Sequence, residues 1–175
     1  MKKQNLILPY QEIQKVKQLW VWLPCTLLAL LFWYGFITQV LMGNTFGSKP
    51  MSDTWMTITF ILIGILLPLF LVLQYLKIEV DSEGLSVQFF PFHLSKHRFY
   101  FHEIASFEET DVQPLRRFGG WGIRHSFKGE KGYIISGSQG IQLNFTAGTV
   151  LVISSSNPKQ LIEALNQAKK QRPKK

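Results

Sequence analysis

Residues 19–40 read LWVWLPCTLLALLFWYGFITQV, and not one of these side chains carries a charge. Residues 55–76, WMTITFILIGILLPLFLVLQYL, are equally apolar and also uncharged. Each segment is long enough to cross a hydrocarbon core of about 30 Å as a helix, which takes about 20 apolar residues. The polar remainder of the chain is too short to cover two helices that are apolar on every face. The sequence therefore predicts a transmembrane helical hairpin over residues 19–76, with spans of about 19–40 and 55–76 and a linker of residues 41–54.

The basic residues around the spans indicate which way the hairpin faces. Those that precede the first span or follow the second are Lys2, Lys3, Lys15, Lys17 and Lys77. The linker carries only Lys49 and Asp53. Cytoplasmic loops of membrane proteins are enriched in Lys and Arg. We therefore predict that both termini are cytoplasmic and that the linker lies outside.

Residues 1–18 are predicted to form a cytoplasmic amphipathic segment. Tyr10, Ile13, Val16 and Trp20 recur at helical spacing. We therefore expect the first helix to begin before the membrane and to rest an apolar face on it.

Polar residues within the spans are few. Gln39 and Gln74 lie near the span ends, and Pro24 and Pro68 lie inside. Neither span contains Asp, Glu, Lys, Arg or His, which are the usual marks of an ion or proton pathway. The pattern favours an anchor, and a transporter or channel subunit made of oligomerised hairpins is the alternative.

From Lys77 onwards the apolar residues alternate with polar ones, as they do in half-buried strands. Seven strands are predicted, at residues 78–80, 85–89, 98–101, 104–112, 133–135, 141–145 and 150–153. A C-terminal helix follows, with Asn157 as N-cap and Pro158 at the first helical position. Its predicted apolar stripe consists of Leu161, Ile162, Leu165 and Ala168. Residues 77–170 are thus expected to form one cytoplasmic domain, and residues 171–175 a basic tail.

Seven strands followed by one helix is also the order of elements in a pleckstrin-homology (PH) domain. The details that carry the resemblance are Phe107 and the stretches 114–124, 137–143 and 157–161. With them, the chain resembles a bacterial family of largely unknown function that carries a PH-like domain after two transmembrane helices. The resemblance implies an all-β sandwich or partial barrel closed by the C-terminal helix, and a location in the bacterial inner membrane.

The candidate site is the stretch PLRRFGGWGIR at residues 114–124, called here the arginine–glycine loop. Its anion- or partner-binding candidates are Arg116, Arg117, Gly119, Gly120, Trp121 and Arg124. Arginine offers a fork of donors for carboxylate or phosphate, and glycine lets a partner approach the backbone closely. The alternative is structural: the arginines pair with Glu108, Glu109 and Asp111, while Phe118 and Trp121 pack the loop against the sandwich.

Other site types have less support in the sequence. Many PH domains bind phosphoinositides at the first strand turn, but here that turn is acidic, with Asp81 and Glu83. His93, His97 and His102 are expected on strands and turns rather than on one helical face, so a metal site is not predicted. Nucleotide-binding, serine-hydrolase and zinc-protease motifs are missing from the sequence.

The leading functional hypothesis is a non-enzymatic membrane protein without a cofactor, whose domain serves as a protein-binding or assembly module. Its partner is expected to be another protein or a second copy of the chain. The alternative is a sensor in which the arginine–glycine loop contacts anionic lipid head groups. The net charge of +8 calls for an anionic partner, and the apolar spans favour a membrane over nucleic acid.

Overall fold

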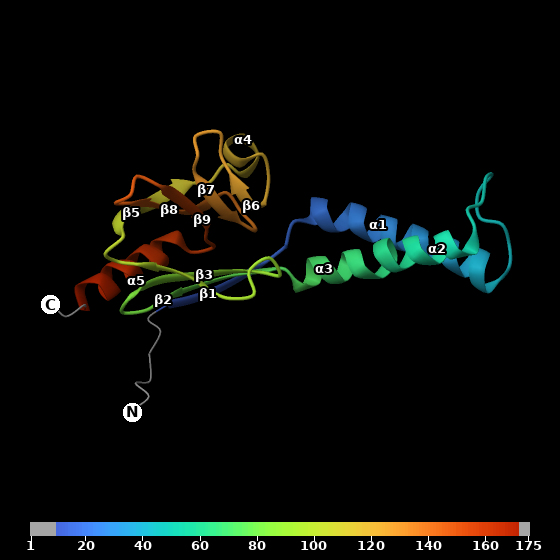
Figure 1. Cartoon of the computed structure of the whole chain (residues 1–175), viewed down its shortest axis with the longest axis horizontal. Helices are drawn as coiled ribbons and strands as arrows, with labels where there is room; N and C mark the ends of the chain where they lie inside the picture. The colour runs from blue at the N-terminus through green and yellow to red at the C-terminus, as the bar shows by residue number, and fades with distance from the viewer. Residues whose placement is uncertain (1–9, 172–175) are drawn as a thin grey trace, which may run out of the picture. The chain divides into compact units, whose positions relative to one another are not determined.

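A computed structural model describes residues 10–171 (Figure 1). The features predicted at Lys2, Lys3 and residues 172–175 lie outside the described residues. The chain divides into two compact units: Val16–Leu73 is helical, and the residues on both sides of it in sequence form the other unit. Each unit is described separately below.

The helical unit consists of two antiparallel rods. The first is α1 (Leu19–Phe36), which continues as a π-helical segment, η1 (Ile37–Leu41). The second comprises α2 (Asp53–Thr59), the π-helical η2 (Phe60–Leu66) and α3 (Leu67–Leu73). Both rods are long and apolar enough to cross a membrane, as predicted. The second ends three residues earlier than expected, because Tyr75 and Leu76 already belong to a strand.

Small residues bring the two rods into contact. Gly35 and Gly64 are buried, and the indole nitrogen of Trp33 donates a hydrogen bond of 3.2 Å to the Gly64 carbonyl. At the far end of the hairpin, the Gln39 amide donates to the Met51 carbonyl at 2.6 Å. The side chains that point away from this contact are mostly apolar and exposed, as in a helix pair made to face lipid.

The described residues of the second unit form nine strands in two sheets. Sheet A has the order β1-β2-β3-β4, and sheet B has the order β5-β8-β9-β7-β6. The strands of sheet A are β1 (Tyr10–Lys15), β2 (Tyr75–Val80), β3 (Gly84–Phe90) and β4 (His97–Tyr100). Those of sheet B are β5 (Ile104–Asp111), β6 (Gly122–His125), β7 (Lys131–Ile134), β8 (Gln139–Phe145) and β9 (Val150–Ser154). All seven predicted strands are therefore present, but two further strands, β1 and β6, were not predicted.

Sheet B contains a parallel pair, because β7 runs parallel to β9 while its other strands pair antiparallel. The two sheets do not close into a barrel. The C-terminal helix α5 (Pro158–Gln171) contacts β2 and β3 of sheet A and β5 and β8 of sheet B. Its predicted apolar stripe is confirmed: Leu161, Leu165 and Ala168 are buried, and Ile162 is half-buried.

The prediction that the first helix begins before the membrane span is wrong. Residues Tyr10–Lys15 instead form strand β1, at the edge of sheet A. In this strand the polar side chains are buried and the apolar one is exposed: Glu12 and Gln14 are buried, whereas Ile13 is 55% exposed. Backbone pairing with β2, from Tyr10↔Val80 to Lys15↔Tyr75, replaces the hydrogen bonds that a helix would make. The β unit therefore begins before the helical hairpin rather than at Lys77.

Glu12 and Gln14 connect β1 to the end of β9, across the two sheets. The Glu12 carboxylate accepts hydrogen bonds from the Ser155 hydroxyl at 2.7 Å and from the Ser156 amide at 2.6 Å. The Gln14 amide donates to the Ser154 carbonyl at 2.6 Å. Because these buried polar groups have partners, burying them is compatible with a stable fold. The strand is thus fixed by polar contacts that an apolar pattern does not reveal.

Candidate functional site

The arginine–glycine loop begins with a short helix, α4 (Pro114–Phe118). Gly119 ends this helix with a φ of 68°, and its amide donates to the Leu115 carbonyl at 3.1 Å. The Gly120 amide donates to the Pro114 carbonyl at 2.9 Å. This is the hydrogen-bonding pattern of a left-handed helix C-cap, in which glycine is favoured for its backbone freedom. Gly119 and Gly120 therefore serve the turn itself.

Arg117 is held inside the β unit. Its guanidinium makes two hydrogen bonds to the Glu130 carboxylate, at 2.8 and 2.7 Å, and one to the Gln142 side-chain oxygen at 2.7 Å. Its Cζ also lies 5.5 Å from the centre of the Phe118 ring. The structural alternative is therefore right for this arginine, although its predicted acidic partners are wrong.

The geometry of β5 accounts for Glu109 and Asp111, and the third predicted acid, Glu108, accepts a hydrogen bond of 3.4 Å from the Gln142 side chain. Thr110 faces Arg117, at 3.4 Å from its guanidinium. Since neighbouring residues of a strand point to opposite faces, Glu109 is turned away from Arg117. Asp111 instead accepts hydrogen bonds from the Gln113 backbone and side-chain amides.

The Arg117–Glu130 pair controls the local charge. Hydrogen bonds from Arg117 outweigh the effect of burial and lower the pKa of Glu130 from 4.5 to about 2. The hydrogen bond to Glu130 likewise raises the pKa of Arg117. Both groups are charged at neutral pH and are hydrogen-bonded to each other. The pair is therefore a structural ion pair and is not free to bind a ligand.

Arg124 and Arg116 differ in whether their side chains contact the rest of the loop. Arg124 folds back over its own loop: its Nε donates to the Trp121 carbonyl at 2.9 Å, and its guanidinium lies beside Gly120. Arg116 is exposed and makes no ion pair with any residue in the described range 10–171. Of the three predicted arginines, Arg116 is thus the one that projects freely.

The aromatic residues of the loop pack as the structural alternative predicts. Phe118 is buried in a cluster with Val112, Ile134 and Val152, and Trp121 packs against the same cluster. The Phe118 ring lies over Gly132, where a Cβ atom would come within 2.9 Å of it. The loop is therefore a fixed part of sheet B.

A hollow of about 700 Å³ opens beside α4. It is lined by Thr110, Asp111, Gln113, Arg116, Arg117, Ser126, Phe127, Lys128 and Glu130. At its border Phe127 is fully exposed and Lys128 is exposed, and the neighbouring Leu115 is 68% exposed. We call the four exposed side chains Leu115, Arg116, Phe127 and Lys128 the α4 face. Sequence reasoning missed Phe127 and Lys128, because the β6–β7 turn that carries them was not recognised.

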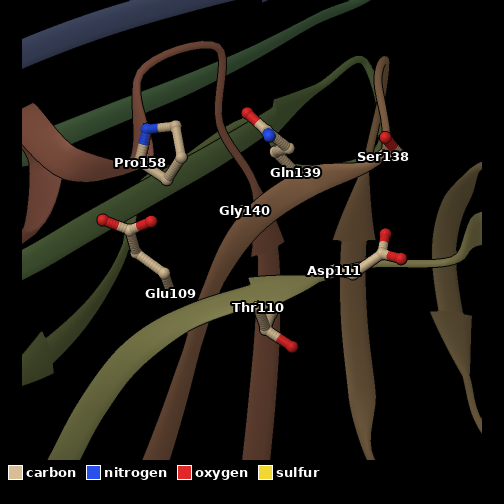
Figure 2. Close-up of a pocket in the computed structure, with 7 residues that line it drawn as sticks. All are labelled: Glu109, Thr110, Asp111, Ser138, Gln139, Gly140 and Pro158. Atoms are coloured by element: carbon tan, nitrogen blue, oxygen red, sulfur yellow. The ribbon is translucent and has the colours of Figure 1, made fainter.

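A second hollow, of about 430 Å³, lies at the end of β5, beside the start of α5. Figure 2 shows Glu109 on the side of Pro158 and Asp111 on the side of Ser138. Gln139 and Gly140 of β8 complete its wall. Its two carboxylates make it a poor site for an anion.

The acidic first turn is neutralised by the β unit's own cations. The Arg98 guanidinium forms ion pairs with the carboxylates of Asp81, at 2.7 Å, and Glu83, at 2.5 Å. Burial alone would raise the pKa of Glu79, but hydrogen bonds from Lys77 and Lys96 outweigh it and lower that pKa. The basic residues of this region are therefore paired with acids.

The three histidines considered as metal ligands do not gather. The rings of His93 and His97 are 4.1 Å apart, whereas His102 stacks on Tyr100 at 5.5 Å. Burial lowers the pKa of His93, and the neighbouring charges of His97 and Lys131 act in the same direction. Within residues 10–171, His, Cys, Asp and Glu form no cluster of three that could hold a metal ion.

These features define a class: a two-sheet β domain with a C-terminal helix, interrupted in sequence by a pair of helices long and apolar enough to cross a membrane. The chain belongs to a family of unknown function, DUF6141, whose family model matches residues 1–171. Searches of curated proteins and of solved structures found no significant match.

Proposed function

We propose that this chain is an integral protein of a bacterial inner membrane, which presents a cytoplasmic, PH-like domain as a non-catalytic protein-binding module. In this proposal the hairpin is an anchor. The α4 face is the binding surface, and its partner is an acidic segment of another protein.

Strand pairing supports the anchor. β1 precedes the hairpin, β2 follows it, and the two strands pair from Tyr10↔Val80 to Lys15↔Tyr75. Paired strands must lie on the same side of a membrane, so the hairpin has to leave and return. The lysines at its two open ends favour the cytoplasm as that side.

The two sheets and the closing helix support a PH-like assignment. The extra strands β1 and β6 and the parallel β7–β9 pair would make it a divergent member. The acidic first turn, satisfied by Arg98, argues for a ligand other than a phosphoinositide.

The α4 face is the observation that carries the binding function. Two large apolar side chains, Leu115 and Phe127, are exposed beside two cations, Arg116 and Lys128. Aromatic and arginine residues on a rigid support are typical of the centres of protein interfaces. The Arg117–Glu130 pair provides that support, since it ties α4 to the turn that carries Phe127 and Lys128.

The lipid-sensor alternative draws less support from the same geometry. Arg117 is occupied by Glu130, and Arg124 folds over the loop. Arg116 and Lys128 would contribute about 1 kcal/mol each near an acidic leaflet, too little to select a particular lipid.

The test is site-specific photo-crosslinking in native membranes, with a benzophenone side chain in place of Phe127. We expect a discrete adduct with another protein, lost when Arg116→Glu and Lys128→Glu are combined. The matched control is Lys159→Glu, an exposed lysine on α5. Adduct formation that survives the double charge reversal, or that is lost equally with Lys159→Glu, would refute the proposal.

A further inference from the structure

We propose that the β3–β4 loop, Pro91–Lys96, is a membrane-contact loop whose Phe92 and Leu94 side chains enter the bilayer interface. This inference rests on the proposed membrane crossing of the hairpin. It adds a second attachment of the β unit to the lipid surface, through a surface distinct from the α4 face.

The loop follows the end of β3, and this end of sheet A also carries the residues that connect to the hairpin. Phe90, the last residue of β3, pairs with Tyr75, and Tyr75 pairs with Lys15. Tyr75 comes two residues after Leu73, the last residue of the second rod. Lys15 comes four residues before Leu19, the first residue of the first rod.

Chain length limits how far the loop can be from the membrane. Two Cα–Cα steps of about 3.8 Å lead from Leu73 to Tyr75, and a strand pairing of about 5 Å leads from Tyr75 to Phe90. The Phe90 Cα is therefore within about 13 Å of the Leu73 Cα, whatever the orientation of the two units. The head-group layer is itself about 5–8 Å thick on each side, so residues just beyond Phe90 are within reach of lipid.

The side chains of the loop suit that position. Phe92 is 59% exposed and Leu94 is 82% exposed, so this short loop carries two large apolar side chains at the surface of the β unit. Tyr75 and Phe90 stack with their ring centres 5.3 Å apart, and aromatic residues are enriched at membrane–water interfaces. Apolar and aromatic side chains that lie this close in sequence and pairing suit the interface between head groups and acyl chains.

The charge of the region also favours a lipid surface. The loop itself contains neither Asp nor Glu, and its Lys96 is paired with Glu79 of β2. Lys15 and Lys17, which precede the first rod in sequence, are both exposed. Basic residues near a bilayer surface are attracted to anionic lipids. Because the loop is so close in the chain to both rods, a lipid surface is a more accessible contact for it than a soluble protein.

Hydrogen bonds hold the loop in shape, with Leu94 largely exposed and the Phe92 ring centre 5.9 Å from that of Phe89 in β3. The Gln88 side chain donates to the carbonyls of His93, at 3.3 Å, and Leu94, at 3.0 Å. The His93 amide donates to the Phe89 carbonyl at 2.7 Å. Ordering before contact lowers the entropic cost of insertion.

The test uses the full chain with Cys25→Ala, reconstituted in vesicles of phosphatidylcholine and phosphatidylglycerol. Single nitroxide labels are placed at Leu94→Cys, at Leu62→Cys in the second rod, and at Ser82→Cys. Ser82 lies in the turn at the other end of the β2–β3 hairpin, about 20 Å along the strands from Tyr75. Collisions with oxygen, which concentrates in lipid, and with a water-soluble nickel chelate are measured for each label.

We expect the label at Leu94 to collide several-fold less with nickel, and more with oxygen, than the label at Ser82. Equal nickel exposure at Leu94 and Ser82, with Leu62 in lipid, would overturn the membrane-contact loop and leave the hairpin intact. Protection of Leu94 from both reagents would mean that protein covers it, which also overturns the inference. Nickel exposure at Leu62 would overturn the membrane crossing itself and, with it, this inference.

Discussion

Replacing Arg117 with Met should destabilise the β unit, whereas replacing its neighbour Arg116 should not. The Arg117 side chain is 21% exposed and that of Glu130 is 14% exposed, so the pair is largely shielded from water. Removing one partner of a fully buried ion pair costs about 3–5 kcal/mol, because the other charge is left behind. Since this pair keeps some solvent contact, we expect a loss of about 2–4 kcal/mol.

The measurement is thermal unfolding of the full chain in detergent, followed by near-ultraviolet circular dichroism of the β unit's packed aromatic residues. A loss of this size corresponds to a lowering of Tm by about 10–20 °C for a unit of about 100 residues. Arg116→Met is the matched control, since it removes the same charge from the same short helix. The reasoning fails if Arg117→Met unfolds within about 0.5 kcal/mol of the unsubstituted protein, or if Arg116→Met costs as much.

The same pair sets a pH dependence. The folded pKa of Glu130 is about 2, against 4.5 in the absence of these contacts. Because the folded pKa is the lower one, the stabilisation is complete above about pH 4.5 and is lost as the pH falls towards 2. The difference in stability between the protein and Arg117→Met should therefore be largest near neutral pH and shrink as the pH falls, because burial favours protonation of the unpaired Glu130 in the variant. A difference that shrinks on raising the pH from 5 to 7 would contradict this assignment.

Two further predictions concern positions whose roles the structure makes specific. Glu12→Ala should destabilise the β unit by about 1–3 kcal/mol in the same melt, because it leaves the Ser155 and Ser156 donors without their acceptor, whereas Gln11→Ala, exposed on the same strand, should change it little. Equal melts for these two variants would show that β1 is not fixed by Glu12. Gly119→Ala should cost about 1 kcal/mol because of its φ of 68°, and Gly119→Asn should recover part of that loss; a neutral Ala variant would disprove the role of the C-cap.

Much of the fold could be predicted because its signals are local. Alternating residues such as Leu85, Val87 and Phe89 face the core, as the pattern indicates. β1 could not be found in this way, since its buried side chains are Glu12 and Gln14 and its partner strand lies beyond the whole hairpin. β6, with the sequence GIRH, is too short and polar to show alternation.

The candidate site was predicted in composition but not in arrangement. That Phe118 and Trp121 would pack against the sheet followed from their size and setting. The partner of Arg117 could not be inferred, since Glu130 is brought close only by the pairing of β6 with β7. Strand alternation, not distance in sequence, turns Glu109 away. The role proposed for Phe92 and Leu94 could not be predicted from the sequence, because it depends on the pairing of Phe90 with Tyr75.

The central claim is that the hairpin crosses the membrane and leaves the β unit on the cytoplasmic side. Its most direct test is the accessibility of single cysteines to a membrane-impermeant reagent, in intact cells that carry Cys25→Ala. We predict that Ser48→Cys, in the linker between the rods, is labelled from outside, and that Ser82→Cys, in the β2–β3 turn, is labelled only after the membrane is opened. Labelling of Ser82→Cys in intact cells, or protection of Ser48→Cys until the membrane is opened, would contradict the claim.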